Sequence, residues 1–315
     1  MAKYRHDLPQ NSGRVFLSDG GLETTLIFHD GFDLPRFEAF TLLDSDKGME
    51  ALRAYYRRYA RMARARGVGF LLETPTWRAN PEWGAKVGYS EEALADINRR
   101  AVDLMLEIRF EYETTQTPMV ISGAIGPRGD GYDPGTLMTP DEAEAYHVRQ
   151  IGILAATEAD MVTAFTLTNS PEAIGIARAA RAAAMPAVIS FTLETDGRLP
   201  TGQSLGEAIA AVDAATAGGP VYYMINCAHP THFEDALETG APWLSRLRGI
   251  RANASMLSHA QLDECTTLDA GDPVDLGHRY RRLRARLGHV NVVGGCCGTD
   301  HRHIEEIGNA YGKAA

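Results

Sequence analysis

The chain has 315 residues, and 23% of them are charged. Its formal net charge is −10, and it contains only four cysteines. This composition argues against a disulfide framework, and the negative charge argues against nucleic-acid binding. No stretch of eighteen uninterrupted apolar residues predicts a membrane span. We therefore expect a cytoplasmic enzyme that acts on small molecules and that could assemble as a homo-oligomer.

The predicted elements begin after a polar, unpatterned N-terminal arm, residues 1–14, and fill a single domain, residues 15–315. Short apolar runs predict eight strands at Val15–Ser18, Gly69–Glu73, Met119–Gly123, Met161–Phe165, Ala187–Phe191, Val221–Asn226, Ile250–Asn253 and Asn291–Gly294. Amphipathic segments between them predict helices at Met49–Arg66, Glu91–Glu113, Pro140–Thr157, Pro171–Ala184, Leu205–Ala217, Pro273–Leu287 and His301–Tyr311.

Strands that alternate with helices indicate a parallel sheet, and eight such units favour an α/β fold of the closed (β/α)8 TIM-barrel type. A doubly wound open sheet is the alternative. However, Asp19-Gly20-Gly21 lacks the later glycine and the acidic ribose partner of a dinucleotide site. In a barrel, the chemistry lies at the carboxyl ends of the strands.

The first strand end carries Asp19, Gly20 and Gly21. Glycine backbone N–H groups can approach a substrate closely, and the Asp19 carboxylate could bind an ammonium group. The alternative is that Asp19 caps the following turn and that the glycines only form it.

Two further strand ends carry Trp77 and Asn253. An aromatic face at the rim attracts a quaternary ammonium or sulfonium, so Trp77 is a candidate wall for a methyl donor, although most aromatics are core residues. Glu73 and Arg78 flank this tryptophan segment and could pair with each other. Asn253 is a further candidate for substrate contact.

The cysteines form the most informative pattern. Cys227 ends the sixth predicted strand, and Cys296 and Cys297 stand side by side after the eighth, among glycines that allow a sharp turn. Three thiolates from two strand ends suit Zn²⁺ with an open fourth position. The cysteines could also be buried apolar residues or a redox pair. Histidines 229, 301 and 303 are weaker candidate ligands that suit turns and helix starts, and Cys265 is incidental.

These segments resemble the homocysteine S-methyltransferase family, which includes betaine-homocysteine methyltransferases and the homocysteine-binding module of methionine synthase. The resemblance rests on Asn226-Cys227, on Gly294 to Thr299, on Asp19-Gly20-Gly21, and on Ser190 to Thr192 with Asp196 to Leu199. It implies a TIM barrel, a zinc ion on the three cysteines, and Asp19 in contact with homocysteine.

The resemblance further implies methyl transfer from an onium donor to the zinc-bound thiol of homocysteine, giving methionine. The donor, whether S-methylmethionine, S-adenosylmethionine or a betaine, is not indicated by the sequence. Alternatives are the same chemistry on another thiol, a demethylase role, and a redox or metal-binding protein whose adjacent cysteines cycle.

One position departs from the family. The fourth strand usually carries a glutamate that helps to bind the substrate amino group, and Phe165 stands in its place. We therefore expect weak binding of homocysteine, unless Asp19 suffices or another acid such as Glu23 substitutes.

Overall fold

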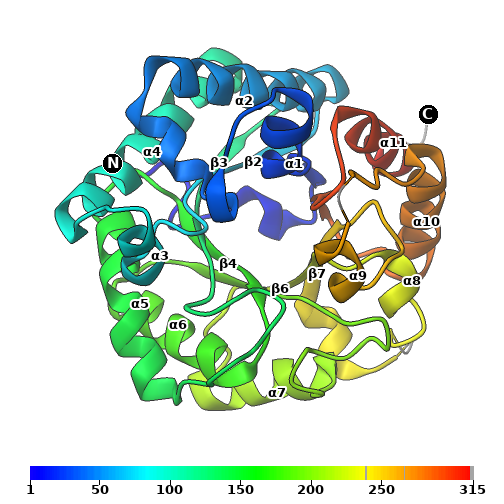
Figure 1. Cartoon of the computed structure of the whole chain (residues 1–315). Helices are drawn as coiled ribbons and strands as arrows, with labels where there is room; N and C mark the ends of the chain where they lie inside the picture. The colour runs from blue at the N-terminus through cyan, green and yellow to red at the C-terminus, as the bar shows by residue number, and fades with distance from the viewer. Residues whose placement is uncertain (238–239, 266, 313–315) are drawn as a thin grey trace.

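The computed structural model describes residues 1–237, 240–265 and 267–312. Eight parallel strands close into a barrel in chain order, and helices surround it (Figure 1). The strands are β1 (Phe16–Leu17), β2 (Gly69–Glu73), β3 (Met119–Ile125), β4 (Met161–Leu167), β5 (Ala187–Phe191), β6 (Tyr223–Asn226), β7 (Leu247–Ala252) and β8 (Val292–Gly295). The predicted (β/α)8 barrel is confirmed.

The outer ring consists of α2 (Asp46–Arg66), α4 (Glu91–Tyr112), α5 (Pro140–Ala155), α6 (Ser170–Ala182), α7 (Leu205–Thr216), α10 (Pro273–Arg286) and α11 (His301–Tyr311). Short helices α1 (Leu22–Thr24), α3 (Pro81–Lys86), α8 (Pro230–Phe233) and α9 (His259–Asp263) lie in the loops between them. The ring closes where α11 contacts α2 (Figure 1). Among the described residues, none of the helices combines the length and the hydropathy that a membrane span requires.

Local sequence sets the helix starts. Thr139 and Ser204 accept hydrogen bonds from backbone N–H groups of the first turns of α5 and α7, and glutamates three residues later bond back to both caps. Because these caps satisfy N–H groups that the helix itself leaves unpaired, they fix where each helix begins. The seven predicted ring helices match the observed ones to within a few residues.

Several strand ends also differ from the predictions by two or three residues. β3 and β4 each continue two residues further, to Ile125 and Leu167, and β7 begins at Leu247 rather than at Ile250. Arg248 and Gly249 interrupt the apolar run of β7. For this reason the sequence pattern did not predict the part of the strand that precedes Ile250. The register between β6 and β7 also shifts between Tyr223 and Met224.

The barrel interior changes character along its axis. Its lower part is apolar, with Phe16, Leu71, Val120, Met161, Val188, Met224 and Val292 in one buried cluster. Since side chains alternate along a strand, the residues two positions further on face the same interior. They are mostly polar and include Ser18, Glu73, Ser122, Thr163, Ser190, Asn226 and Arg251, all buried. A polar layer therefore lies beneath the carboxyl ends of the strands.

The N-terminal segment closes the opposite end of the barrel. Leu8 joins the apolar interior cluster, and Gln10 is buried on the same side. The backbone N–H of Tyr4 donates to Asp160 at 2.7 Å, and the Arg5 guanidinium donates to main-chain carbonyls of the last residue of α5 and of the segment that follows it. The predicted arm, residues 1–14, is thus packed against the barrel, and its treatment as a separate unit stays a prediction.

Candidate active site

Three sulfurs converge at the carboxyl end of the barrel. The Sγ atoms of Cys227, Cys296 and Cys297 lie within 4.8 Å of one another, and they form the one such group of potential metal ligands in the described part of the chain. Cys227 and Cys297 are 3.9 Å apart, and Cys227 and Cys296 are joined as a disulfide with a Cα–Cα distance of 5.4 Å. The predicted meeting of two strand ends is confirmed. Cys265 is exposed and stands apart.

Among the glycines that the sequence suggested for the turn at the adjacent cysteines, Gly298 adopts it, whereas Gly294 and Gly295 do not. Cys227 itself adopts the left-handed conformation with φ 54°, and Gly298 does so with φ 79°. By contrast, a Cβ on Gly294 would lie 1.9 Å from Ser18 Oγ, and one on Gly295 would lie 2.1 Å from Thr299 Oγ1. Gly294 and Gly295 are therefore needed for close packing of β8, while the turn comes later.

Asn226 holds the first cysteine loop in place, and sequence reasoning treated it only as part of a motif. Its Oδ1 accepts from Ser190 Oγ at 2.6 Å and from the Thr166 N–H at 2.9 Å. Its Nδ2 donates to Thr166 Oγ1 at 2.8 Å and lies 3.9 Å from Cys296 Sγ. This one amide thus ties together β4, β5 and β6 beneath the sulfurs.

The donor set fits a thiophilic ion. Three sulfurs at this spacing, from short loops on a rigid barrel, match a zinc site with an open position, provided that the disulfide is reduced. Burial raises the pKa of the Cys297 thiol, so a cation is needed to hold it as thiolate at neutral pH.

Two of the three candidate histidines have other partners, and the third is exposed. His229 caps α8, with Nδ1 2.8 Å from Thr231 Oγ1, and burial lowers its pKa to about 4. His303 bonds to Asp300, and His301 is exposed at the start of α11. The interpretation of these histidines as turn and helix-start residues is confirmed.

Asp19 follows β1 next to the end of β8, where its carbonyl oxygen accepts from the Gly295 N–H at 3.0 Å, but its carboxylate already has a cationic partner. Arg251 Nη2 donates to Asp19 Oδ1 at 2.6 Å, and Tyr55 OH donates to Oδ2 at 3.0 Å. Burial raises the pKa of Asp19, whereas the charge of Arg251 and the bond from Tyr55 act against this. Sequence reasoning missed Arg251 because a single arginine within a strand gives no sign of a partner 232 positions away.

The backbone groups of the two glycines after Asp19 are also engaged. Gly20 accepts from Tyr55 OH and from Arg251, and the Gly21 N–H donates to the Thr299 carbonyl at 3.0 Å. A Cβ on Gly21 would lie 2.7 Å from the Cys296 carbonyl oxygen. The glycines therefore allow β1 to pack against the cysteine loop, and the Gly21 N–H does not point to a substrate carboxylate.

Two further carboxylates stand near Asp19. Burial raises the pKa of Glu23 to about 7 and that of Glu73 to about 8, and Arg251 lowers both. Within the described residues, neither carboxylate oxygen of Glu73 finds a hydrogen-bond partner, so the predicted Glu73–Arg78 pair does not form. Arg78 instead faces Asp130 at 3.6 Å. Because these pKa values lie near 7 and 8, a large share of both carboxyl groups is protonated at neutral pH.

Trp77 and Phe165 lie side by side at the rim. Trp77 Nε1 is 3.4 Å from the Phe165 carbonyl oxygen, and the Arg78 guanidinium stacks 4.7 Å from the Trp77 ring centroid. A cation of the chain itself therefore lies on one face of the proposed donor wall. Phe165 is 8% exposed, and its ring centroid is 5.1 Å from Arg251 Cζ.

Asn253 follows β7 and is buried, and its Oδ1 lacks a hydrogen-bond partner among the described residues.

The loops with Tyr132 and His259 meet at the cysteines. Tyr132 OH lies 3.5 Å from Cys297 Sγ, and the Tyr132 ring packs 4.2 Å from the His259 ring. His259 Nε2 is 2.6 Å from the Cys227 carbonyl oxygen, and Nδ1 is 3.2 Å from Glu194. Three loops thus meet over the sulfurs.

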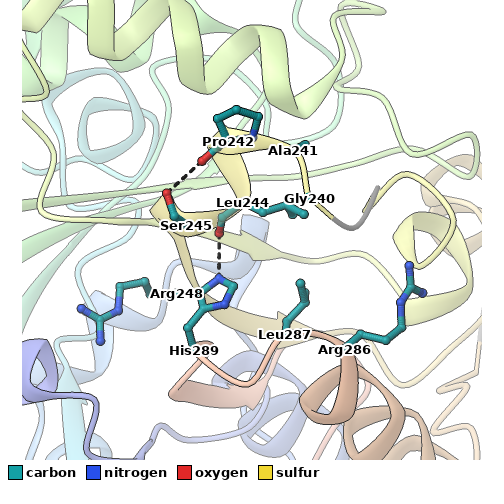
Figure 2. A pocket seen from close by; sticks show the side chains of 9 residues that line it. All are labelled: Gly240, Ala241, Pro242, Leu244, Ser245, Arg248, Arg286, Leu287 and His289. Carbon is teal, nitrogen blue, oxygen red and sulfur yellow. Dashed lines mark hydrogen bonds between the residues drawn. The ribbon is translucent and has the colours of Figure 1, made fainter.

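A surface pocket of about 740 Å³ lies elsewhere, between the start of β7 and the end of α10 (Figure 2). Its polar side chains are engaged: His289 bonds to the Leu244 carbonyl, and Arg286 bonds to the Leu237 carbonyl. Because it is at the amino end of the strands, it is remote from the sulfurs.

Comparisons with known proteins identify the family of the chain. The family model described as homocysteine S-methyltransferase matches residues 16–311. The selenocysteine Se-methyltransferase of Brassica oleracea var. italica is 25% identical over 96% of this chain and 90% of its own. The homocysteine S-methyltransferase 4 of Zea mays is 24% identical over 97% of this chain and 92% of its own.

Solved structures share the fold. The homocysteine methyltransferase MmuM of Escherichia coli, in its oxidized form, superposes with a TM-score of 0.76 at 21% identity, covering 96% of this chain and 97% of that one. Its metallated form gives a TM-score of 0.73 at 20% identity, covering 96% and 98%.

Proposed function

We propose, from the premise that the chain belongs to the homocysteine S-methyltransferase family and is a methyltransferase, that it moves a methyl group from an onium donor to a thiol with Zn²⁺ as cofactor. The observation that carries the proposal is the group of three sulfurs within 4.8 Å at the carboxyl end of the barrel. Homocysteine is the first acceptor to test. S-Methylmethionine, S-adenosylmethionine and a betaine are the donors.

Cys227, Cys296 and Cys297 would hold the zinc, and the metallated form of the E. coli homocysteine methyltransferase supports a metal here. When bound, zinc lowers the pKa of a thiol at its open position, so that the acceptor reacts as a thiolate. Asn226 fixes the cysteine loop, Tyr132 lies against Cys297 and His259 against the Cys227 carbonyl, and the exposed Cys297 leaves the sulfurs open to an incoming reactant.

The transfer balances without another reagent. The acceptor thiol releases its proton to solvent, and a sulfur lone pair forms a bond to the methyl carbon of the donor. The bond from that carbon to the donor sulfonium or ammonium breaks, and its electron pair leaves with a neutral sulfide or amine. The chain aligns the two reactants, which is the main contribution of a rigid site to such a displacement.

Two alternatives are carried by particular observations. Phe165, at the place of the family glutamate, favours a different thiol acceptor or a demethylase role. The redox alternative would involve Cys227 with Cys296, which the structure joins, and not the adjacent pair that we considered. A cytoplasmic location, assembly as a homo-oligomer and contact of Asn253 with substrate stay predictions.

The test begins with reduced protein loaded with zinc and then dialysed. We expect one zinc per chain and methylated thiol, detected by mass, with at least one donor in a matrix of donors and thiols. Removal of zinc with a chelator abolishes transfer, and added zinc restores it. Cys265→Ser is the matched control and retains both zinc and activity. Full activity in metal-free protein contradicts the proposal.

A further inference from the structure

The end of β1 is neutralised by the chain itself. Asp19 is 3% exposed and Arg251 is 8% exposed, and the two side chains are in direct contact at 2.6 Å. A guanidinium keeps its charge at any pH that the protein meets. Tyr55 binds the other carboxylate oxygen. An ammonium group arriving at Asp19 would therefore meet a carboxylate whose charge is already balanced and whose oxygens both accept hydrogen bonds.

The facing wall is equally unsuited to an ammonium group. Phe165 is buried and lies against Arg251, with 5.1 Å between its ring centroid and the guanidinium carbon. An apolar ring supplies no acceptor to replace the lost hydration of an ammonium group, and the adjacent guanidinium repels it. The wall instead suits the methylene groups of a substrate.

Arg251 also has unused binding capacity. Its Nε donates to the Gly295 carbonyl at 3.0 Å, and its Nη2 donates to Asp19 and to the Gly20 carbonyl. Its Nη1 donates to none of the described residues, yet it is not among the fully enclosed polar atoms without a partner. Since Gly295, which accepts from Nε, directly precedes Cys296, the guanidinium group lies next to the loop that carries two of the three sulfurs. A guanidinium N–H of this kind binds a carboxylate well.

We propose that the acceptor is a thiol that carries a carboxylate and lacks an ammonium group beside it. Its sulfur would bind at the open position of the zinc that the three cysteines hold. Its carboxylate would bind Arg251 Nη1, and its carbon chain would pack on Phe165. This inference rests on the proposed function, because it names the substrate class of the same site. Arg251 and Phe165 are then the residues that determine specificity, in place of a pair of carboxylates.

The test compares three thiols that differ in one group each. Homocysteine carries both groups, 4-mercaptobutanoate lacks the amine, and 3-aminopropane-1-thiol lacks the carboxylate. With zinc-loaded protein, we expect kcat/KM for 4-mercaptobutanoate to exceed that for homocysteine about tenfold or more, and the aminothiol to be the poorest. Equal or better use of homocysteine, or a preference for the aminothiol, overturns the inference.

Binding is measured separately from turnover. In cobalt-substituted protein, the absorption bands of the metal report entry of each thiol without a donor, and we expect the same order of affinity. If that order holds while no donor supports transfer, the proposed function fails and the specificity inference stands. If no thiol perturbs the cobalt spectrum, both fail. If transfer occurs with the reverse order, only the specificity inference fails.

Variants locate the effect on Arg251. Arg251→Gln should lower kcat/KM for 4-mercaptobutanoate about tenfold to hundredfold, mainly through KM, and should improve the aminothiol, because Asp19 is then free. Arg251→Lys keeps the charge and the order of the three thiols. Arg248→Gln, on the same strand at the opposite end of the barrel, is the matched control. An equal loss for all three thiols in Arg251→Gln, with intact folding by circular dichroism, contradicts a role in specificity.

Discussion

The two halves of the site differ in how they relate to the family pattern. The sulfur half, Cys227 with Cys296 and Cys297, keeps the family motifs, and its sulfurs lie within 4.8 Å of one another. The recognition half, Asp19 with Arg251 and Phe165, keeps one family residue and surrounds it with a cation and an aromatic ring. This difference is what we would expect if the means of activating a thiol is retained while the group recognised beside it has changed, as we propose.

The largest expected effect breaks the sulfur half. Cys227→Ser, Cys296→Ser or Cys297→Ser should each reduce bound zinc below about a tenth of a site and lower kcat by about a thousandfold, because the metal loses one of its three ligands. The barrel should stay folded, since its apolar layers do not depend on the metal. Metal analysis and far-ultraviolet circular dichroism measure both. Normal zinc content in any of the three variants would remove that cysteine from the site.

A smaller effect is expected from the support beneath the sulfurs. Asn226→Ala removes every bond that joins this amide to Ser190 and Thr166, and should weaken zinc affinity about tenfold to hundredfold. Ser190→Ala removes only one of those bonds and should have a smaller effect. Competition with a coloured zinc chelator gives both affinities. Equal affinities in wild type and Asn226→Ala would show that the cysteine loop holds its shape without the amide.

The recognition half can be tested by restoring the family residue. Phe165→Glu alone should raise kcat/KM for homocysteine less than tenfold, because Arg251 lies close enough to take the new carboxylate as a partner. Together with Arg251→Gln, the gain should reach about tenfold or more. The double-mutant cycle measures the coupling. Independent, additive effects of the two changes would contradict the idea that Arg251 pairs with the new carboxylate in Phe165→Glu.

The contrast between the halves also explains what the sequence could predict. The cysteines follow apolar runs, and the carboxyl ends of parallel strands meet at one rim, so their convergence could be expected from position alone. Arg251 gave no such signal, because its role depends on a contact with Asp19 at the far end of the chain. Trp77 was predictable as a rim residue, but the stacking of its neighbour Arg78 on its ring was not.

The last prediction concerns the polar layer on which both halves rest. Glu73 is 4% exposed, and burial raises its pKa from 4.5 to about 8, against the charge of Arg251. Between those two pH values, Glu73 is therefore protonated in the folded state and ionised in the unfolded state. It follows that the free energy of unfolding decreases as the pH rises from about 4.5 to about 8, by up to about 3–5 kcal/mol.

Glu73→Gln removes this titration while it keeps the shape of the side chain. The variant should show a flatter dependence of unfolding free energy on pH, and should be more stable than wild type at pH 9, where the buried carboxylate of the wild type is ionised. Urea unfolding at a series of pH values measures both. Glu50→Gln, whose side chain is 68% exposed, is the control and should leave the profile unchanged. Parallel profiles for wild type and Glu73→Gln would mean that Glu73 stays ionised in the folded barrel, as a second counter-ion of Arg251.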